Sequence, residues 1–248
     1  MTGFQRKAIE AAGGSWQNAK KFNDILERLT TECIPAVEWV GDLAKSTIAW
    51  KLAVYRVSLV YRGVALGQAT AQLWNSRNAV VALLTARAMM ETGAILRDFT
   101  DTCEVAYEAE DLKTLNKAAD AAFFATRRSQ VWDRPFPPAK NVLTVIDKMK
   151  KFVPEVRAHY DMLSEYAHPN HSGHFGAFGS LDPTTGRVDF SETGLFNSGM
   201  LSHVLAGAFL LGLSRSTRTG YSALFRKLPS CSKIESRLAE ESPSDGKQ

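Results

Sequence analysis

The sequence is poor in cysteine and in net charge, and each shortage excludes a class of protein. Three cysteines stand far apart among 248 residues, at Cys33, Cys103 and Cys231, which leaves no disulfide framework and no four-thiolate zinc site. Lys and Arg total 30 against 26 Asp and Glu, so the formal net charge of +4 is far from that of a nucleic-acid coat protein. With 17 glycines and 9 prolines, collagen-like and disordered chains are excluded as well.

The N-terminus also lacks an apolar run of secretory length, because residues 1–14 include charged side chains. Residues 193–214 carry no charge and come close to the roughly 20 apolar residues that span a bilayer. Polar side chains interrupt that stretch, however, and leave Val204–Leu213 as its strongest apolar run. We therefore predict a core helix there, no membrane contact, and a cytoplasmic protein with reduced thiols.

Apolar residues recur every three or four positions along most of the chain, which is typical of amphipathic helices. The longest pattern, residues 77–99, is rich in Ala and Met and predicts the central helix of a bundle. Weak alternation on both sides of a turn with Pro183 and Gly186 predicts a β-hairpin near residues 175–192. We therefore predict an all-α fold, a multi-helix bundle with a small β-hairpin insertion, with further helices at residues 22–29, 37–60, 141–152, 154–167 and 196–215.

The domain organisation that we predict is simple. Residues 1–238 form a single helical domain, with N-terminal helices in residues 1–75 and a bundle core at about residues 76–220. The polar residues 239–248 are expected to be a disordered tail.

Charge is segregated along the chain, although its total is nearly balanced. Residues 98–120 hold seven carboxylates and two lysines, which predicts a solvated acidic helical face. Residues 127–157 hold eight Lys and Arg against three carboxylates, and they include a proline-rich loop at 129–139. Because aromatic side chains lie in that loop, we expect any RNA contact from this basic segment, with Arg127 and Arg128 as candidate binding residues. The alternative is a loop that its aromatic residues anchor in the core.

Three of the five histidines lie in the segment Tyr160–His174, just where the helical pattern ends. Asp161, Glu165 and His168 stand at i, i+4 and i+7, which predicts one helical stripe. A carboxylate one turn before an imidazole can orient the ring and stabilise its charged form. The stripe therefore makes His168 and Glu165 candidates for catalysis, and the neighbouring candidates for binding are Tyr160, Asn170 and His171.

Two further roles are open to these histidines, metal binding and termination of the helix. His168, His171 and His174 recur every three residues and could surround zinc, and Glu165-x-x-His168 is half of a di-iron signature. The second Glu-x-x-His of a di-iron site is missing, as is the glutamate of a metalloprotease, so we predict no metal and no cofactor. Without chemistry, His168 would be a helix-end residue that interacts with terminal carbonyl groups.

A second constellation is the pair Arg87 and Glu91 on the apolar helix. The i, i+4 spacing places both charges on one face, in surroundings where an unpaired charge is costly. The pair is therefore either a structural ion pair or part of a site that faces His168. Arg97, further along the same helix, is expected at a solvent-facing end.

The pattern Tyr160-x-x-Leu163-Ser164-Glu165-x-x-His168-Pro169-Asn170-x-x-Gly173, preceded by a helix with Arg87-x-x-x-Glu91, resembles uncharacterised bacterial all-helical proteins. These are similar, more distantly, to the HEPN superfamily of helical bundles in toxin–antitoxin and phage-defence systems. The resemblance covers about residues 77–173 and implies that His168 is the catalytic histidine of a metal-independent ribonuclease. HEPN ribonucleases carry an arginine a few residues before that histidine. Here those positions hold Asp161 to Ser164, so Arg87 would have to take its place.

Two functional hypotheses follow. In the first, the protein is an RNA-directed HEPN-like ribonuclease: His168 is the general acid/base, Arg87 stabilises the phosphate transition state, and Glu91 or Glu165 orients them. The resemblance then implies a homodimer, because a helical-bundle ribonuclease needs two copies to form its cleft. In the second, the protein is a non-catalytic interaction or sensor subunit of a defence or stress system, with a homo-oligomer or another protein as partner. Its His-Pro-Asn turn is then purely structural.

Overall fold

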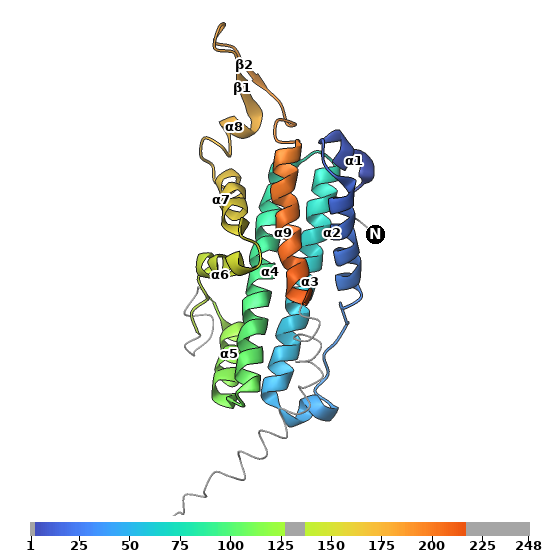
Figure 1. Ribbon diagram of the computed structural model, residues 1–248, viewed down its shortest axis with the longest axis vertical. Coiled ribbons are helices and arrows are strands. Elements are labelled where there is room, and N and C mark those ends of the chain that lie inside the picture. Colours follow the sequence, from blue (N-terminus) through green and yellow to red (C-terminus); the bar gives the residue numbers. More distant parts are fainter. Residues whose placement is uncertain (1–2, 127–136, 217–248) are drawn as a thin grey trace, which may run out of the picture. The chain divides into compact units, whose positions relative to one another are not determined.

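The computed structural model describes residues 3–126 and 137–216, with side chains except at positions 42, 45 and 213–216. The predicted all-α fold with a small β-hairpin is confirmed in these ranges (Figure 1). The helices are α1 (Arg6–Ala11), α2 (Trp16–Thr30), α3 (Thr47–Asn75), α4 (Ala79–Glu108), α5 (Leu112–Phe124), α6 (Val142–Lys148), α7 (Val156–Ala167), α8 (Phe175–Phe178) and α9 (Ser198–Ser216). The remaining elements are the 3-10 turns η1 (Gly41–Lys45) and η2 (Met149–Lys151) and the strands β1 (Gly179–Leu181) and β2 (Val188–Phe190).

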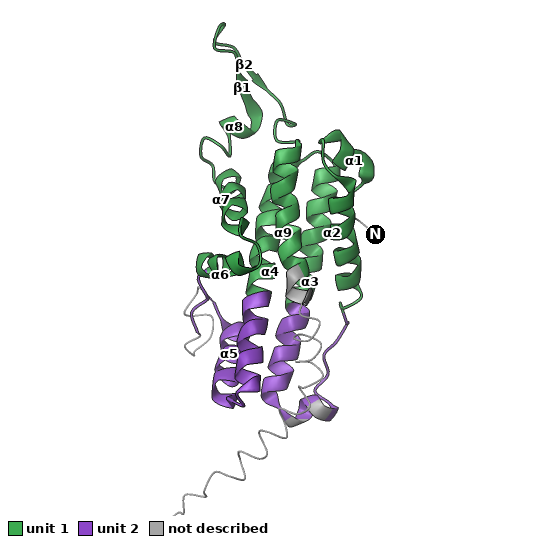
Figure 2. Cartoon of the chain, in the orientation of Figure 1, with its two compact units in different colours: residues 1–33, 59–96, 142–214 green, residues 34–58, 97–141, 215–248 purple. Residues whose placement is uncertain are grey.

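The chain divides into two compact units, each with its own hydrophobic core (Figure 2). Unit 1 consists of residues 1–33, 59–96 and 142–214, and unit 2 of residues 34–58, 97–141 and 215–248. The two long helices, α3 and α4, each contribute residues to both units. The predicted tail, residues 239–248, and most of the proline-rich loop at 129–139 lie outside the described residues.

In unit 1, α9 contacts α2, α3 and α4, and glycines lie at the points of closest approach. A Cβ atom at Gly93 on α4 would lie 2.7 Å from the backbone nitrogen of Leu211 on α9. One at Gly207 on α9 would lie 2.7 Å from the carbonyl oxygen of Ala86 on α4. Gly212 approaches Ile25 of α2. The absence of a side chain at Gly93 and Gly207 therefore lets α4 and α9 pack backbone against backbone, and at Gly212 it makes room for the Ile25 side chain.

The apolar stretch near residue 204 is a core helix, as the interruption by polar residues predicts. Along α9 the buried side chains include Leu201, Val204, Ala208, Leu210 and Leu211. Within the described ranges one helix, α4, is long and apolar enough to cross a membrane, and 56% of its most apolar window is buried inside the protein. A buried core helix passes the same test of length and composition.

Most carboxylates of the expected acidic face are exposed or half-buried, as predicted, but Asp98 and the neighbouring Arg97 are buried. Asp98 is 5% exposed and forms an ion pair with Lys140 at 2.6 Å, and the predicted solvent-facing Arg97 is also buried, with Asp101 at 2.7 Å. Burial of these charges is tolerated because each meets an opposite charge. Tyr55 stacks edge-on against Phe99 in the same core, and burial, with a smaller contribution from Cys103, raises the pKa of its hydroxyl to about 12.

Two predicted elements begin later than periodicity suggested. The helix expected at residues 37–60 begins at Thr47, because Gly41 adopts a left-handed φ of 59° and the Ser46 hydroxyl accepts a hydrogen bond from the Ala49 N–H. The strand expected from residue 175 begins only at Gly179. Residues 175–178 form the short helix α8, whose first N–H donates to Nδ1 of His174.

The arm, which we define as residues 168–197, connects α7 to α9 and carries the hairpin (Figure 1). Its base is anchored in unit 1, because Ala177 and Leu195 are buried and the Phe196 ring packs against Trp74 at 4.9 Å. The hairpin strands are antiparallel, with Gly179 opposite Phe190, Ser180 opposite Asp189 and Leu181 opposite Val188. Since side chains alternate between faces, Leu181, Val188 and Phe190 share one face, and Ser180 and Asp189 share the other.

We expect Gly93→Ala to lower the free energy of unfolding by about 1–3 kcal/mol, because its methyl group would meet the α9 backbone. Urea denaturation measures this difference. Gly63→Ala is the matched control on α3: its Cβ would meet only the end of the Leu211 side chain, which can rotate, and alanine favours a helix by about 1 kcal/mol. Equal losses in the two variants would contradict the close α4–α9 contact.

Candidate functional site

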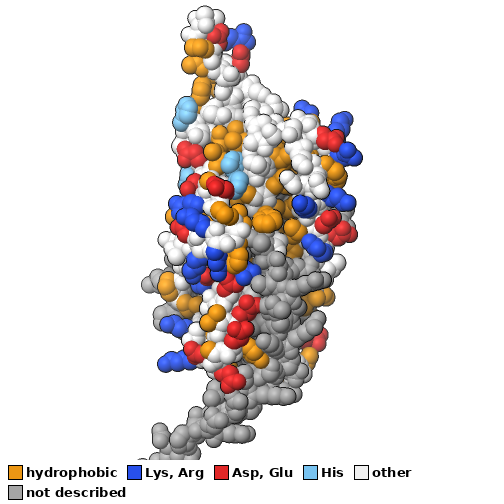
Figure 3. Space-filling model, viewed as in Figure 1, with side chains coloured by type: hydrophobic (Ala, Val, Ile, Leu, Met, Phe, Trp, Pro, Cys, Tyr) orange, Lys and Arg blue, Asp and Glu red, His pale blue; other side chains and the backbone are white. Residues whose placement is uncertain are grey.

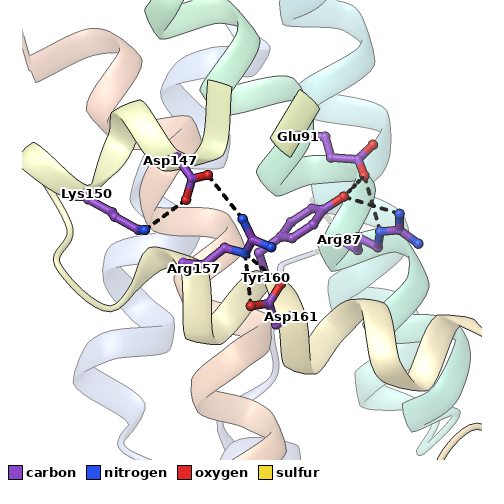
Figure 4. A network of polar contacts seen from close by, with 7 residues as sticks. All are labelled: Arg87, Glu91, Asp147, Lys150, Arg157, Tyr160 and Asp161. Carbon is purple, nitrogen blue, oxygen red and sulfur yellow. Dashed lines mark hydrogen bonds and ion pairs between the residues drawn. The ribbon is translucent and has the colours of Figure 1, made fainter. Parts of the chain in front are cut away.

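A buried tyrosine on α7 joins the predicted ion pair of α4 (Figure 4). The Tyr160 hydroxyl donates a hydrogen bond to Oε1 of Glu91 at 2.9 Å and accepts one from Nη2 of Arg87 at 3.2 Å. Nε of Arg87 lies 3.2 Å from the same Glu91 oxygen. The predicted meeting of Arg87 and Glu91 is therefore confirmed, and Tyr160 connects the pair to α7.

The environment of Arg87 keeps it charged and held in place. Burial alone would lower the pKa of its guanidinium group, but the hydrogen bond and charge of Tyr160, together with Glu91, raise that pKa above its ordinary value. The guanidinium carbon also lies 5.4 Å from the centre of the Tyr160 ring. Tyr160 thus binds both members of the ion pair, although Nε of Arg87 makes no hydrogen bond of its own, and this geometry suits the docking of α7 on α4.

The described part of the basic segment is largely neutralised by neighbouring carboxylates (Figure 4). Asp147 on α6 lies 2.9 Å from Nζ of Lys150 and 3.1 Å from Nη1 of Arg157. Arg157 also binds Asp161 one turn later at 2.8 Å, and that hydrogen bond raises the pKa of its guanidinium. Arg127 and Arg128, the candidate RNA-binding residues, lie outside the described residues.

His168 does not belong to the predicted helical stripe. Helix α7 ends at Ala167, and His168 follows with extended backbone angles (φ −95°, ψ 147°) and an exposed side chain. Pro169 disfavours helical angles at the preceding residue, which explains the end of the helix. Within the described chain, Tyr160 is the α7 partner of Arg87 and Glu91, and the hydrogen bonds of that network do not include His168.

The carboxylate expected to orient His168 binds the turn instead. Glu165 accepts a hydrogen bond from Nδ2 of Asn170 at 2.7 Å, and Oδ1 of Asn170 accepts one from the Gly173 N–H at 3.0 Å. A Cβ atom at Gly173 would lie 1.8 Å from the carbonyl oxygen of His168, so only glycine fits there. Glu165, Asn170 and Gly173 thus close a tight turn at the base of the arm.

The histidines of the turn do not converge. The rings of His171 and His174 are 6.3 Å apart, and His171 lies against Phe175 at 5.4 Å. Among residues 3–126 and 137–212, no three or more His, Cys, Asp or Glu side chains form a group that could hold a metal ion.

A different histidine pair connects α7 to α9. Nδ1 of His159 lies 2.9 Å from Nδ1 of His203, and the ring centres are 5.0 Å apart. Burial lowers the pKa of both imidazoles; Glu155 partly opposes this at His159, and His159 adds to it at His203. The sequence analysis missed this pair, since His203 interrupts an apolar stretch 44 residues after His159 and no local spacing connects them.

A separate hollow of about 620 Å³ in unit 1 lies beside the N-terminal segment. Two of its amides hold that segment: Asn23 binds both backbone groups of Phe4, and Asn75 binds the Gln5 N–H and the Gly3 carbonyl. The other polar residues that line the hollow are Gln5, Glu27, Gln72 and Ser76. Its two asparagines therefore hold the N-terminal segment in place.

Comparison of this chain with models of known protein families, with curated proteins and with solved structures finds no match to any of them.

We expect Glu91→Ala to lower the free energy of unfolding by about 1–3 kcal/mol, because Arg87 and Tyr160 then lose a shared partner. Chemical denaturation measures the change. Glu10→Ala removes the carboxylate of an exposed Arg–Glu pair with the same i, i+4 spacing and is expected to leave stability within error of wild type. The structural role of the α4–α7 network would be contradicted if both variants behaved alike.

Proposed function

We propose that this protein is a non-catalytic helical interaction protein that binds a second copy of itself through the hairpin of the arm. The observation that carries the proposal is the exposed apolar face of that hairpin. Leu181 is 52% exposed and Phe190 is 75% exposed, although both are large apolar side chains on the same face. Figure 3 shows apolar side chains on the hairpin next to charged ones.

The hairpin is too small to be stable on its own. Each strand has three residues, and a single two-stranded hairpin is marginal in water unless further strands or a helix cover its apolar face. Leu181 and Phe190 lack such a cover in the described chain. A partner that buries this face would complete the hairpin.

The distribution of charge favours a second copy as that partner. The apolar face carries no charged side chain, while Arg187 and Asp189 form an ion pair on the polar side, at 2.7 Å. Two such faces can therefore pack together in an isologous contact without burial of charge.

The catalytic hypothesis has less support from the described geometry. Its arginine and one of its glutamates, Arg87 and Glu91, are engaged with Tyr160, and Glu165 binds Asn170. A HEPN-like ribonuclease stays the second candidate because one observation favours it: His168 is exposed and is the first residue of the arm. Association through the arm would bring two copies of that imidazole into one assembly.

We expect Leu181→Lys to weaken self-association at least about tenfold, because a charge at the centre of an apolar contact costs on the order of 2 kcal/mol or more. Sedimentation velocity over a range of protein concentrations measures the effect. Ser180→Lys is the matched control, since it places the same charge one residue away on the polar face, opposite Asp189. A wild type that stays monomeric at every soluble concentration, or equal association of the two variants, would overturn the proposal.

We expect folded His168→Ala to behave as wild type in RNA cleavage and in growth inhibition on expression, because the proposed function does not use the imidazole. Both assays compare the two proteins at equal soluble amounts, with circular dichroism to confirm folding. Cleavage of RNA by the wild type that His168→Ala loses would refute the non-catalytic proposal and establish the ribonuclease candidate.

A further inference from the structure

Two consecutive residues of α7 fix this helix in unit 1. Tyr160 binds Arg87 and Glu91 of α4, and His159 binds His203 of α9. The arm leaves α7 at residue 168 and enters α9 at residue 198. The histidine pair therefore connects the two helices between which the arm is inserted, about two turns from the end of α7.

The geometry of the pair suits a proton better than a metal ion. The Nδ1 atoms face each other across 2.9 Å, an ordinary hydrogen-bond distance. Zinc–nitrogen bonds are about 2.0 Å long, so an ion bound by both atoms in tetrahedral geometry would need them further apart. Among the described residues, no third His, Cys, Asp or Glu completes a metal-binding group around them.

The hydrogen bond can survive one added proton but not two. In the neutral pair, one Nδ1 carries the hydrogen and the other accepts it. A first proton can bind to the free Nε2 of the donor ring. The hydrogen bond stays in place, and the donor ring becomes a positively charged imidazolium. A second proton must occupy the accepting Nδ1, so that two N–H groups and two positive charges then face each other across the contact. The two imidazoles thus titrate as a coupled pair.

Among the charged groups near the pair, Glu155 favours a positive charge on His159, but less strongly than burial opposes it. Helix α7 contributes Glu155, whose charge favours protonation of His159, while Arg157 and Asp161 bind each other. On α4, Arg87 and Glu91 are paired, and on α6 and η2 Asp147 binds Lys150 and Arg157, with Lys148 and Lys151 as further cations. The described side chains of α9, up to residue 212, include no charged residue.

We propose that the His159–His203 contact is a pH-sensitive switch that holds α7 on α9 when neutral and releases α7, with the arm that follows it, when doubly protonated. Only the consequence of this switch for self-association rests on the proposed function: release of α7 in acid would disturb the surface that the arm offers to a second copy. The release itself is a property of one chain.

The direction of the pH effect follows from burial. Because burial lowers the pKa of both imidazoles in the folded protein, the unfolded chain, with a histidine pKa of about 6.5, binds protons more tightly. The contribution of the pair to stability is therefore complete above about pH 6.5 and is lost as the pH falls through the lowered values.

The test is hydrogen exchange of α7 and the first part of the arm, residues 156–178, in dilute monomeric protein at pH 7.5 and at pH 5. After correction for the intrinsic pH dependence of exchange, we expect these amides in the wild type to exchange several-fold faster at pH 5. His203→Asn places an amide where Nδ1 stood and can donate to or accept from His159 in either protonation state. In this variant we expect the acceleration to disappear.

The arm contains histidines of its own, so the control is the double variant His171→Asn, His174→Asn, which is expected to keep the wild-type response. Acceleration that persists in His203→Asn, or its absence from the wild type, would overturn the proposal. The proposal would also be overturned if the double variant alone lost the faster exchange at pH 5, because the effect would then come from the histidines of the arm. Since the samples are monomeric, failure of self-association would not affect this result.

Discussion

Between Gly93 and Gly207, the backbones of α4 and α9 lie so close that a single methyl group has no room. The rest of unit 1 depends on this contact, because α9 also approaches Gly63 of α3 through Leu211 and Ile25 of α2 through Gly212. With its core filled in this way, α9 gives the unit a rigid helix that begins at the end of the arm. In such a closely packed core, a small displacement of α9 is transmitted to the helices that contact it.

Helix α7 is attached to that core by polar contacts as well as apolar ones, and this distinguishes it from α9. Its buried side chains are Val156, Tyr160 and Leu163, and the hydroxyl of Tyr160 and the imidazole of His159 point to two different helices. Hydrogen bonds of this type are directional and depend on protonation, while apolar contacts do not. The end of the arm at α9 is therefore held by packing that does not depend on pH, while the end at α7 is held in part by hydrogen bonds that do. That asymmetry is what the proposed interaction surface and its pH dependence have in common.

Helical periodicity was enough to predict the all-α fold and the core position of α9, because a buried helix face places apolar residues at regular spacing in the sequence. Alternation and turn residues predicted the hairpin. The i, i+4 spacing likewise predicted that Arg87 and Glu91 meet. It could not predict Tyr160 or His203 as contacts, because periodicity tells which face of a helix is buried and not which helix covers it. Proximity in sequence misled at His168: a stripe shared with Glu165 exists only while the helix continues, and Pro169 ends it. Alternation in the hairpin indicated an apolar face, but not that the face is exposed at Leu181 and Phe190.

We propose that a second copy covers the exposed apolar face of the hairpin. Hydrogen exchange of the hairpin amides, residues 179–190, as a function of protein concentration at pH 7.5 tests it most directly. We expect fast exchange of these amides in dilute protein and protection that grows with concentration, while the amides of α4 stay protected throughout. Hairpin exchange that is slow at the lowest concentration, or that does not change with concentration, would contradict the claim.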